Sequence, residues 1–194
     1  MTHHRRRNNG IDPSKINETV ELSPAQRYAA FKQTQAKQRT VAAEFARSMP
    51  FELDEFQMQA NDALEAGDNV LVAAPTGAGK TVAADFAIYL AQTRNVKAFY
   101  TTPIKALSNQ KYHDLVDQYG TDKVGLLTGD TSINSEADIV VMTTEVLRNM
   151  LYEHSVTLEA LRYVILDEVH YLADRFRGPV WEEVIIHLPK NVNI

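Results

Sequence analysis

The sequence predicts an α/β fold, with a mostly parallel sheet flanked by helices, and two observations support this prediction. Short apolar runs rich in valine, isoleucine, leucine and tyrosine recur along the chain, and a helix-length segment or a turn separates each run from the next. A glycine-rich turn, "AAPTGAGKTV" at residues 73–82, follows the first of these runs. Ligands bind at the carboxyl ends of parallel strands, so this turn is the first candidate site.

The chain opens with a segment that we do not expect to fold. Residues 1–22 are polar and rich in turn formers, which predicts a disordered basic arm. Ser23-Pro24 is typical of a helix start, and a glutamine- and alanine-rich helix is expected to run to Arg47 before Met49-Pro50 stops it. Residues 23–50 are therefore predicted to be a helical extension, with a thin apolar face formed by Tyr28, Phe31, Val41 and Phe45.

Residues 51–194 alternate between strand-like and helix-like patterns, which predicts the main domain. The expected strands cover residues 69–73, 96–100, 124–127, 138–142 and 162–166. The expected helices cover about residues 54–66, 80–93, 104–119, 144–153 and 178–188.

Composition excludes several classes of protein. The 194 residues include no cysteine, so disulfides and thiolate metal sites are excluded, and no apolar stretch reaches the roughly 18 residues of a membrane span. Residues 1–50 carry nine lysines and arginines against four acidic residues, whereas residues 51–194 carry 11 against 21. A basic arm thus precedes an acidic body, and a cytoplasmic location with no membrane contact is expected.

The turn at residues 73–82 has the pattern of a phosphate-binding loop. Ala74, Pro75, Thr76, Gly77, Ala78 and Gly79 place little side chain between the preceding apolar run and the helix that Lys80 and Thr81 open. Backbone N–H groups can then converge on phosphate oxygens at a helix N-terminus. Lys80 would reach the β- and γ-phosphates of ATP, and the Thr81 hydroxyl would bind Mg²⁺. The usual pattern begins with glycine where this chain has Ala74, and an ordinary turn that caps a helix is the alternative.

A second motif, "YVILDEVH" at residues 163–170, is an apolar strand that ends in two carboxylates. Asp167 would hold Mg²⁺, and Glu168 would orient and deprotonate the attacking water. An Asp-Glu pair at a strand end is often only a helix cap, so this interpretation depends on its combination with the phosphate-binding loop.

Together with five further segments, these motifs resemble superfamily-two helicases with a DEVH box, and most closely the superkiller-type RNA helicases that work with RNA-degrading exosomes. The further segments, in the family's order, are "FELDEFQ" (51–57), "TTPIKALSNQKY" (101–112), "GLLTGD" (125–130), "MTTEVLRNML" (142–151) and "RGPVWEE" (177–183). The resemblance implies a RecA-like P-loop domain, with Gln57 reading the adenine edge and His170 relaying the nucleotide state toward RNA.

Three of these segments each follow an apolar strand and are rich in residues that can hold phosphate oxygens. They are expected to grip the backbone of single-stranded RNA, independently of its sequence, through Pro103, Lys105, Gly129, Asp130, Thr143 and Thr144. A capped helix start is the alternative explanation for each segment, and both Thr102-Pro103 and Thr144 with Glu145 fit such a start.

The resemblance implies an ATP-dependent RNA helicase that requires ATP and Mg²⁺. It also implies a second RecA-like domain with arginine fingers, and the chain is expected to be the truncated front part of a longer protein, inactive alone. Val192 and Ile194 alternate as at the start of another strand, which would lie between residues 69–73 and 162–166. A DNA helicase or translocase of a sister branch and an inert nucleotide-binding fragment remain alternatives.

Overall fold

The computed structural model describes Ser23, Ala25, Tyr28, Lys32 and residues 39–175 and 177–194. The chain divides into two units, Met1–Arg39 and Thr40–Ile194. The predicted basic arm over residues 1–22 lies outside the described residues. So does Phe31, which is predicted to lie on the apolar face of the helical extension. Within the described part, no helix combines the length and the apolar character that crossing a membrane requires.

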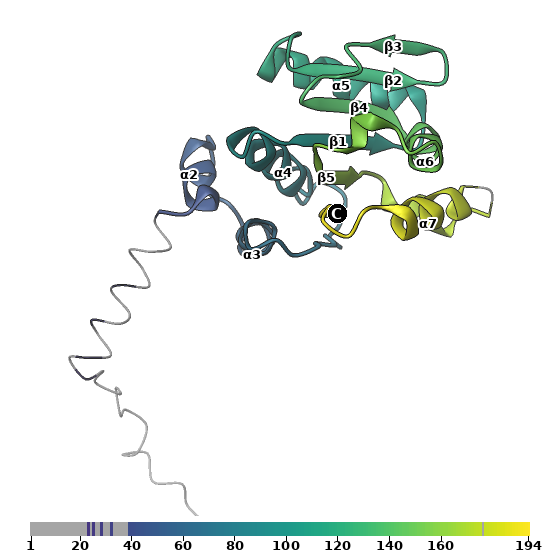
Figure 1. Ribbon diagram of the computed structural model, residues 1–194. Coiled ribbons are helices and arrows are strands. Elements are labelled where there is room, and N and C mark those ends of the chain that lie inside the picture. The colour runs from purple at the N-terminus through teal and green to yellow at the C-terminus, as the bar shows by residue number, and fades with distance from the viewer. Residues whose placement is uncertain (1–22, 24, 26–27, 29–31, 33–38, 176) are drawn as a thin grey trace, which may run out of the picture. The chain divides into compact units, whose positions relative to one another are not determined.

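Residues Thr40–Ile194 fold around a five-stranded sheet with the strand order β3-β2-β4-β1-β5 (Figure 1). The pairs β1–β4, β1–β5 and β2–β4 are parallel, and β3 pairs antiparallel with β2. The predicted, mostly parallel sheet is therefore confirmed. The sequence does not predict β3, because three residues of mixed polarity look like a turn. The strands are β1 (Lys97–Thr102), β2 (Val124–Thr128), β3 (Thr131–Ile133), β4 (Ile139–Thr143) and β5 (Leu161–Leu166).

The first expected strand, residues 69–73, is not assigned as a strand, so that expectation is wrong for the described chain. Val70 N donates to Ile194 O at 2.8 Å, and Asn193 forms a parallel bridge with Tyr163 of β5. Asn193 and Ile194 therefore lie between β5 and residues 69–70, at the place where the sequence predicts another strand. A strand needs consecutive backbone pairs, and the pairing here reaches only to Ile194, the last residue of the chain.

The five helices expected in the main domain are all present, each within one residue of the expected ends. Two short 3₁₀ helices, η2 (Val156–Leu158) and η3 (Val169–Ala173), are additional. The α-helices are α3 (Glu55–Ala66), α4 (Thr81–Thr93), α5 (Lys105–Tyr119), α6 (Thr144–Tyr152) and α7 (Gly178–His187).

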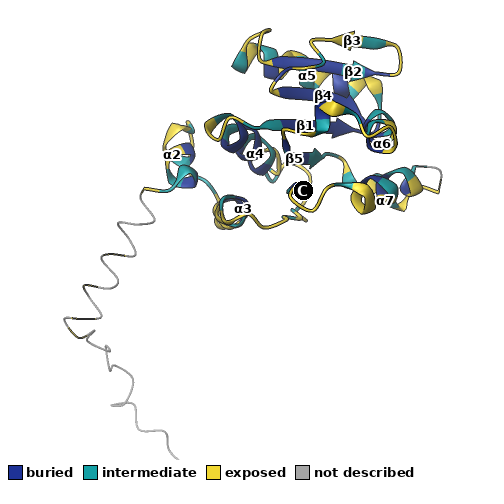
Figure 2. Ribbon diagram, in the orientation of Figure 1, coloured by how far each residue is buried: buried dark blue, intermediate teal, exposed yellow. Residues whose placement is uncertain are grey.

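The strand β1 lies between β4 and β5 and is buried along most of its length (Figure 2). Its side chains alternate between two layers, as the two-residue repeat of a strand requires. Phe99 packs in one layer with Leu147 of α6 and Val184 of α7. Tyr100 packs in the other layer with Ile88 of α4 and Leu115 of α5. Helices therefore cover both faces of the sheet, and Tyr100 lies on the face that α4 and α5 cover.

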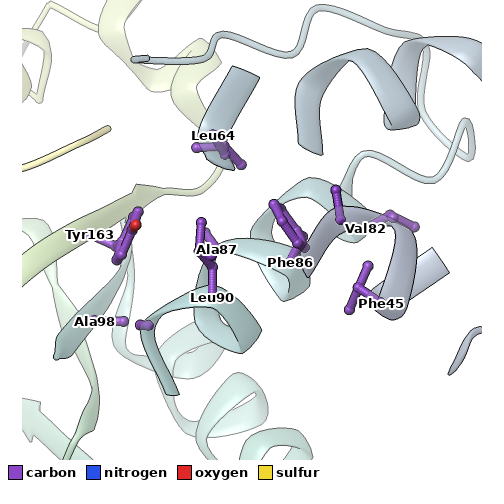
Figure 3. Close-up of a cluster of buried hydrophobic side chains, with 10 residues drawn as sticks. Phe45, Leu64, Val82, Phe86, Ala87, Leu90, Ala98 and Tyr163 are labelled. Atoms are coloured by element: carbon purple, nitrogen blue, oxygen red, sulfur yellow. The ribbon is translucent and has the colours of Figure 1, made fainter. Parts of the chain in front are cut away.

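The helix α2 (Val41–Ser48) packs on α4 through aromatic contacts. Phe45 is 1% exposed, and its ring centroid lies 5.2 Å from that of Phe86 (Figure 3). The ring of Tyr89 is also close, with its centroid at 5.4 Å. Leu64 of α3 belongs to the same buried cluster. The helical extension thus shares a core with the main domain from residue 41 onward.

The expected helix from Ser23 to Arg47 is corrected at its C-terminal part, because α2 starts anew after a turn at Arg39–Thr40. The Thr40 side chain accepts a hydrogen bond from Ala43 N at 3.1 Å. The Glu65 carboxylate of α3 accepts hydrogen bonds from Val41 N at 3.0 Å and from Ala42 N at 2.7 Å. A helix start gains stability from such side-chain acceptors, and Glu65, distant in sequence, could not be identified as one.

Candidate functional site

Two glycines shape the turn that links residues 69–73 to α4. Gly77 and Gly79 have φ angles of +83° and +75°, which glycine adopts without the steric cost that a side chain imposes. Ala78 N donates to Pro75 O at 3.2 Å and closes the turn that contains Thr76. The helix α4 then begins directly after the turn, so the predicted order of glycine-rich turn and helix is confirmed.

Gln57 of α3 forms a hydrogen bond to this turn. Its side chain is buried, and Oε1 accepts a hydrogen bond from Asp54 N at 2.8 Å. Its Nε2 donates to Gly79 O at 3.0 Å. A Cβ atom added to Gly79 would lie 2.5 Å from that nitrogen and would displace the Gln57 amide, while the φ of +75° independently favours glycine there. The adenine contact expected of Gln57 stays a prediction.

Lys80 and Thr81 stand exposed where the turn meets α4. The Lys80 ammonium donates to Ala74 O at 2.7 Å and to Pro75 O at 3.1 Å, which holds the cation over the turn. Thr81 is the first residue of α4, and a helix N-terminus favours anions. A cation, a hydroxyl and glycine backbone at a helix start fit a nucleotide triphosphate. Lys80 would hold its phosphates, and Thr81 with Asp167 would hold Mg²⁺, which neutralises phosphate charge when bound.

Asp167 follows the last residue of β5, and backbone hydrogen bonds fix both its main chain and its carboxylate. Asp167 N donates to Thr101 O at 3.0 Å, which continues the pairing with β1. Glu168 N donates to Asp167 Oδ1 at 2.8 Å. Glu168 has a φ of +57°, uncommon for a residue with a side chain, and its carboxylate lies 3.0 Å from His170 Nδ1. Glu168, the predicted catalytic base, and His170, the predicted coupling residue, are therefore in contact.

Three side chains connect α4 to the Asp167 carboxylate at the end of β5. Asp85 of α4 accepts a hydrogen bond from Lys111 of α5 at 3.1 Å. The Lys111 ammonium lies 4.9 Å from the centroid of the Tyr100 ring, and the Tyr100 hydroxyl donates to Asp167 Oδ2 at 2.7 Å. Asp85 follows Thr81 by four residues on the same helix face. These contacts therefore run from Asp85 on α4 through Lys111 and Tyr100 to the carboxylate of Asp167.

Burial affects the ionisation of two of these groups. Burial raises the pKa of the Tyr100 hydroxyl, and the neighbouring Asp167 carboxylate raises it further. Tyr100 therefore keeps its proton at neutral pH and acts as the donor. Burial also raises the pKa of Asp85, and Lys111 opposes that shift.

The carboxyl ends of β1 and β4 meet in a group of hydroxyls. Thr144 is buried, and its hydroxyl donates to Thr102 O at 3.2 Å. The Thr102 hydroxyl lies 2.7 Å from the hydroxyl of Ser108 in α5. Thr143 is the N-cap residue of α6, and Pro103 is buried after β1. In this group the Thr144 hydroxyl joins two strand ends, and the expected contacts of Pro103, Thr143 and Thr144 with nucleic acid stay predictions.

Lys105 and Asp130 form an exposed ion pair at the same edge of the sheet. Lys105 Nζ lies 2.6 Å from Asp130 Oδ2, and Thr128 donates to Asp130 Oδ1 at 3.0 Å. Hydrogen bonds from Lys105 and Thr128 lower the pKa of Asp130. Gly129, before Asp130, is exposed. The structure thus brings together Lys105 and Asp130, which the sequence assigns to separate motifs.

Residues 54–194 match the family model described as DEAD/DEAH box helicase. This match includes the glycine-rich turn, Asp167 and Glu168, and it covers well over half of the chain. The chain belongs to the DEAD/DEAH box helicase family. The resemblance derived from the motifs is therefore confirmed.

Several relatives of this helicase-family chain are known. It is 62% identical over 150 residues to "Probable helicase HelY" of Mycobacterium tuberculosis, covering 77% of the chain and 17% of that protein. It is 54% identical over 147 residues to "Antiviral helicase SKI2" of Saccharomyces cerevisiae, covering 76% and 11%. It is 52% identical over 150 residues to "DExH-box ATP-dependent RNA helicase DExH11" of Arabidopsis thaliana, covering 77% and 11%. The chain thus spans less than a fifth of each relative's length.

A solved structure confirms the RecA-like helicase fold. The Mycobacterium smegmatis helicase Lhr bound to ssDNA and AMP-PNP superposes with a TM-score of 0.61 at 28% identity. The match covers 79% of this chain and 23% of that chain.

Sequence reasoning did not single out Asp85, Lys111 or Tyr100 in this helicase domain. The spacing of four residues between Thr81 and Asp85 was an available signal, because it places a carboxylate below the predicted metal ligand on one helix face. Tyr100 gave no such signal, since a tyrosine in a buried strand is an ordinary core residue.

Proposed function

We propose that this chain provides the ATP-binding part of an ATP-dependent RNA helicase, which couples ATP hydrolysis to movement along single-stranded RNA. The observation that carries this proposal is the turn at Gly77 and Gly79, with Lys80 held over it and α4 directly after it. Such a turn suits a nucleotide triphosphate because backbone N–H groups, a cation and a helix N-terminus all attract phosphate.

In this proposal the remaining site residues divide the work. Asp167 and Thr81 hold the magnesium of the nucleotide, and Glu168 orients and deprotonates the attacking water. His170 contacts Glu168 at 3.0 Å, so a change at this catalytic base can be transmitted to the histidine. Gln57 links the turn to α3 through its hydrogen bond to Gly79 O, and in this proposal its side chain contacts the adenine of the nucleotide.

We place RNA at the edge formed by the carboxyl ends of β1, β2 and β4, where Lys105 and the starts of α5 and α6 lie. Backbone dipoles and one lysine suit a sequence-independent grip on phosphates, and they compensate for the acidic body. The relative from Arabidopsis thaliana is named as an RNA helicase, and the superkiller-type resemblance points the same way. A second RecA-like domain, RNA-degradation machinery as a partner and a cytoplasmic location are part of this proposal.

The test compares the full-length parent protein with its Lys80→Ala variant. We expect oligo(U) RNA to stimulate ATP hydrolysis by the parent protein. Lys80→Ala should abolish hydrolysis while leaving the fold intact, as judged by thermal unfolding. Stimulated hydrolysis that persists in the Lys80→Ala variant would refute the assigned role of the turn.

DNA is the second candidate substrate, because the solved structure of Lhr contains ssDNA. RNA and DNA oligomers of equal length and sequence separate the two candidates in the same assay. Stronger stimulation by DNA would replace the RNA proposal with a DNA translocase. A parent protein that binds nucleotide without hydrolysing it would instead support an inert nucleotide-binding module.

A further inference from the structure

Both oxygens of the Asp167 carboxylate receive a hydrogen bond, and the two donors differ in kind. The backbone N–H of Glu168 donates to Oδ1 at 2.8 Å, and the Tyr100 hydroxyl donates to Oδ2 at 2.7 Å. The first contact is local, because the two residues are adjacent. The second joins β1 to the end of β5, which lie side by side in the sheet (Figure 1). The two donors together orient the plane of the carboxylate, and Tyr100 supplies the contact that comes from another strand.

The Tyr100 ring is itself held from the helix side of the sheet. Tyr100 is 3% exposed, and the Lys111 ammonium lies over its ring at 4.9 Å from the centroid. Lys111 is fixed by its ion pair with Asp85 at 3.1 Å, and both side chains are largely shielded from water, at 15% and 31% exposed. Such shielding strengthens a cation–π contact relative to an exposed one.

We propose that Tyr100 is a positioning residue for the metal site: its hydroxyl orients the Asp167 carboxylate toward the magnesium of the bound nucleotide, and Lys111, anchored on Asp85, holds the ring in place. This inference rests on the proposed nucleotide function. Hydrogen bonds from a second layer of residues fix the orientation of metal-binding side chains, and their loss typically costs 10- to 100-fold in metal affinity. Asp85 sits four residues after Thr81, so α4 carries both the second metal ligand and the anchor of this chain.

The substitution Tyr100→Phe separates positioning from packing, since phenylalanine keeps the ring and its contact with Lys111 and removes only the hydroxyl. The chain offers a matched control in Tyr163→Phe. Tyr163 is 2% exposed in β5, and its hydroxyl accepts a hydrogen bond from Arg94. Loss of that hydroxyl removes an equally buried hydrogen bond from the same sheet without touching Asp167.

The experiment measures binding of a fluorescent ATP analogue, with the ribose labelled by a methylanthraniloyl group, to the chain of 194 residues. Titrations run in EDTA and at a series of Mg²⁺ concentrations. For Tyr100→Phe we expect affinity in EDTA equal to that of the unsubstituted chain, and a half-maximal Mg²⁺ concentration about 10- to 100-fold higher. Tyr163→Phe should match the unsubstituted chain in both measurements. Thermal unfolding of each variant verifies that it folds.

Lys111→Met provides a second arm, because it removes the ammonium and keeps a side chain of similar length. We expect it to raise the Mg²⁺ requirement in the same direction by a smaller factor. Combined with Tyr100→Phe it should add little, since Lys111 acts through the hydroxyl that Tyr100→Phe has already removed.

A Mg²⁺ midpoint for Tyr100→Phe that equals that of the unsubstituted chain would overturn the inference and leave the proposed function intact. An equal shift in Tyr163→Phe would also overturn it, because the effect would then belong to the sheet in general. If the unsubstituted chain binds the analogue no better with Mg²⁺ than in EDTA, the proposed function fails and this inference fails with it.

Discussion

Replacing Gly79 by alanine should damage the glycine-rich turn more than the same change at Gly77. Both glycines have left-handed backbone angles, φ +75° and +83°, so either alanine carries a backbone cost of about 1–2 kcal/mol. A Cβ at Gly79 would also lie 2.5 Å from Gln57 Nε2, whereas a Cβ at Gly77 meets no atom of the described residues within 4 Å. The difference between the two variants thus isolates the contact with Gln57.

The additional cost at Gly79 comes from the hydrogen bond that Gln57 must give up. Gln57 Nε2 donates to Gly79 O at 3.0 Å from a buried position, and leaving a buried donor unsatisfied costs about 1–3 kcal/mol. We therefore expect Gly77→Ala to lower the free energy of unfolding by about 1–2 kcal/mol and Gly79→Ala to lower it by about 2–5 kcal/mol.

Urea unfolding of the two single variants measures these values, and a double-mutant cycle identifies their cause. In a Gln57→Ala background the clash is absent, so Gly79→Ala should cost no more than Gly77→Ala does. Equal destabilisation by Gly77→Ala and Gly79→Ala in the Gln57-containing chain would refute the reasoning. Nucleotide affinity measured on the same variants should fall more for Gly79→Ala than for Gly77→Ala.

Three further substitutions have outcomes that the structure determines. Asn61 is 1% exposed, and neither polar atom of its side chain has a hydrogen-bond partner among the described residues. Replacing it with leucine, which has a similar shape, should therefore raise the free energy of unfolding in urea by about 1–3 kcal/mol, and a loss of stability would contradict this. The Glu65 carboxylate accepts hydrogen bonds from two N–H groups at the start of α2, and Glu65→Ala removes this cap, which is worth about 1 kcal/mol. Hydrogen exchange of the amides in Val41–Ser48 should therefore accelerate, and unchanged exchange would contradict the cap. If Lys105 contacts a phosphate, Lys105→Ala should weaken binding of the parent protein to oligo(U). Because one phosphate contact fewer releases fewer counterions, the slope of log affinity against log salt concentration should fall by about 0.7, and an unchanged slope would show that Lys105 contacts no phosphate.

Local patterns in the sequence predicted the helices and four of the strands, because each is determined mainly by its own residues. The helix α4, for example, follows a glycine turn and has buried apolar residues throughout, and its predicted start is one residue from the observed one. Residues 69–73 show the limit of this reasoning. Their apolar character predicts a strand, but a strand forms only where several consecutive residues pair with another segment. In the described residues, residues 69–73 make a single such backbone hydrogen bond, from Val70 N to Ile194 O.

The same limit explains which parts of the candidate site the sequence could supply. Lys80, Thr81 and Asp167 belong to contiguous motifs in which each residue type suits phosphate or metal chemistry by itself. The contacts that orient them join different elements: Tyr100 is 67 positions from Asp167, and Gln57 is 22 positions from Gly79. Neither pair is announced by spacing, because the parallel register of β1 and β5 brings the first together and the packing of α3 on α4 brings the second. In this fold the sequence therefore identifies the residues that we propose to contact the nucleotide, whereas the residues that hold them in position emerge only from the pairing of strands and helices.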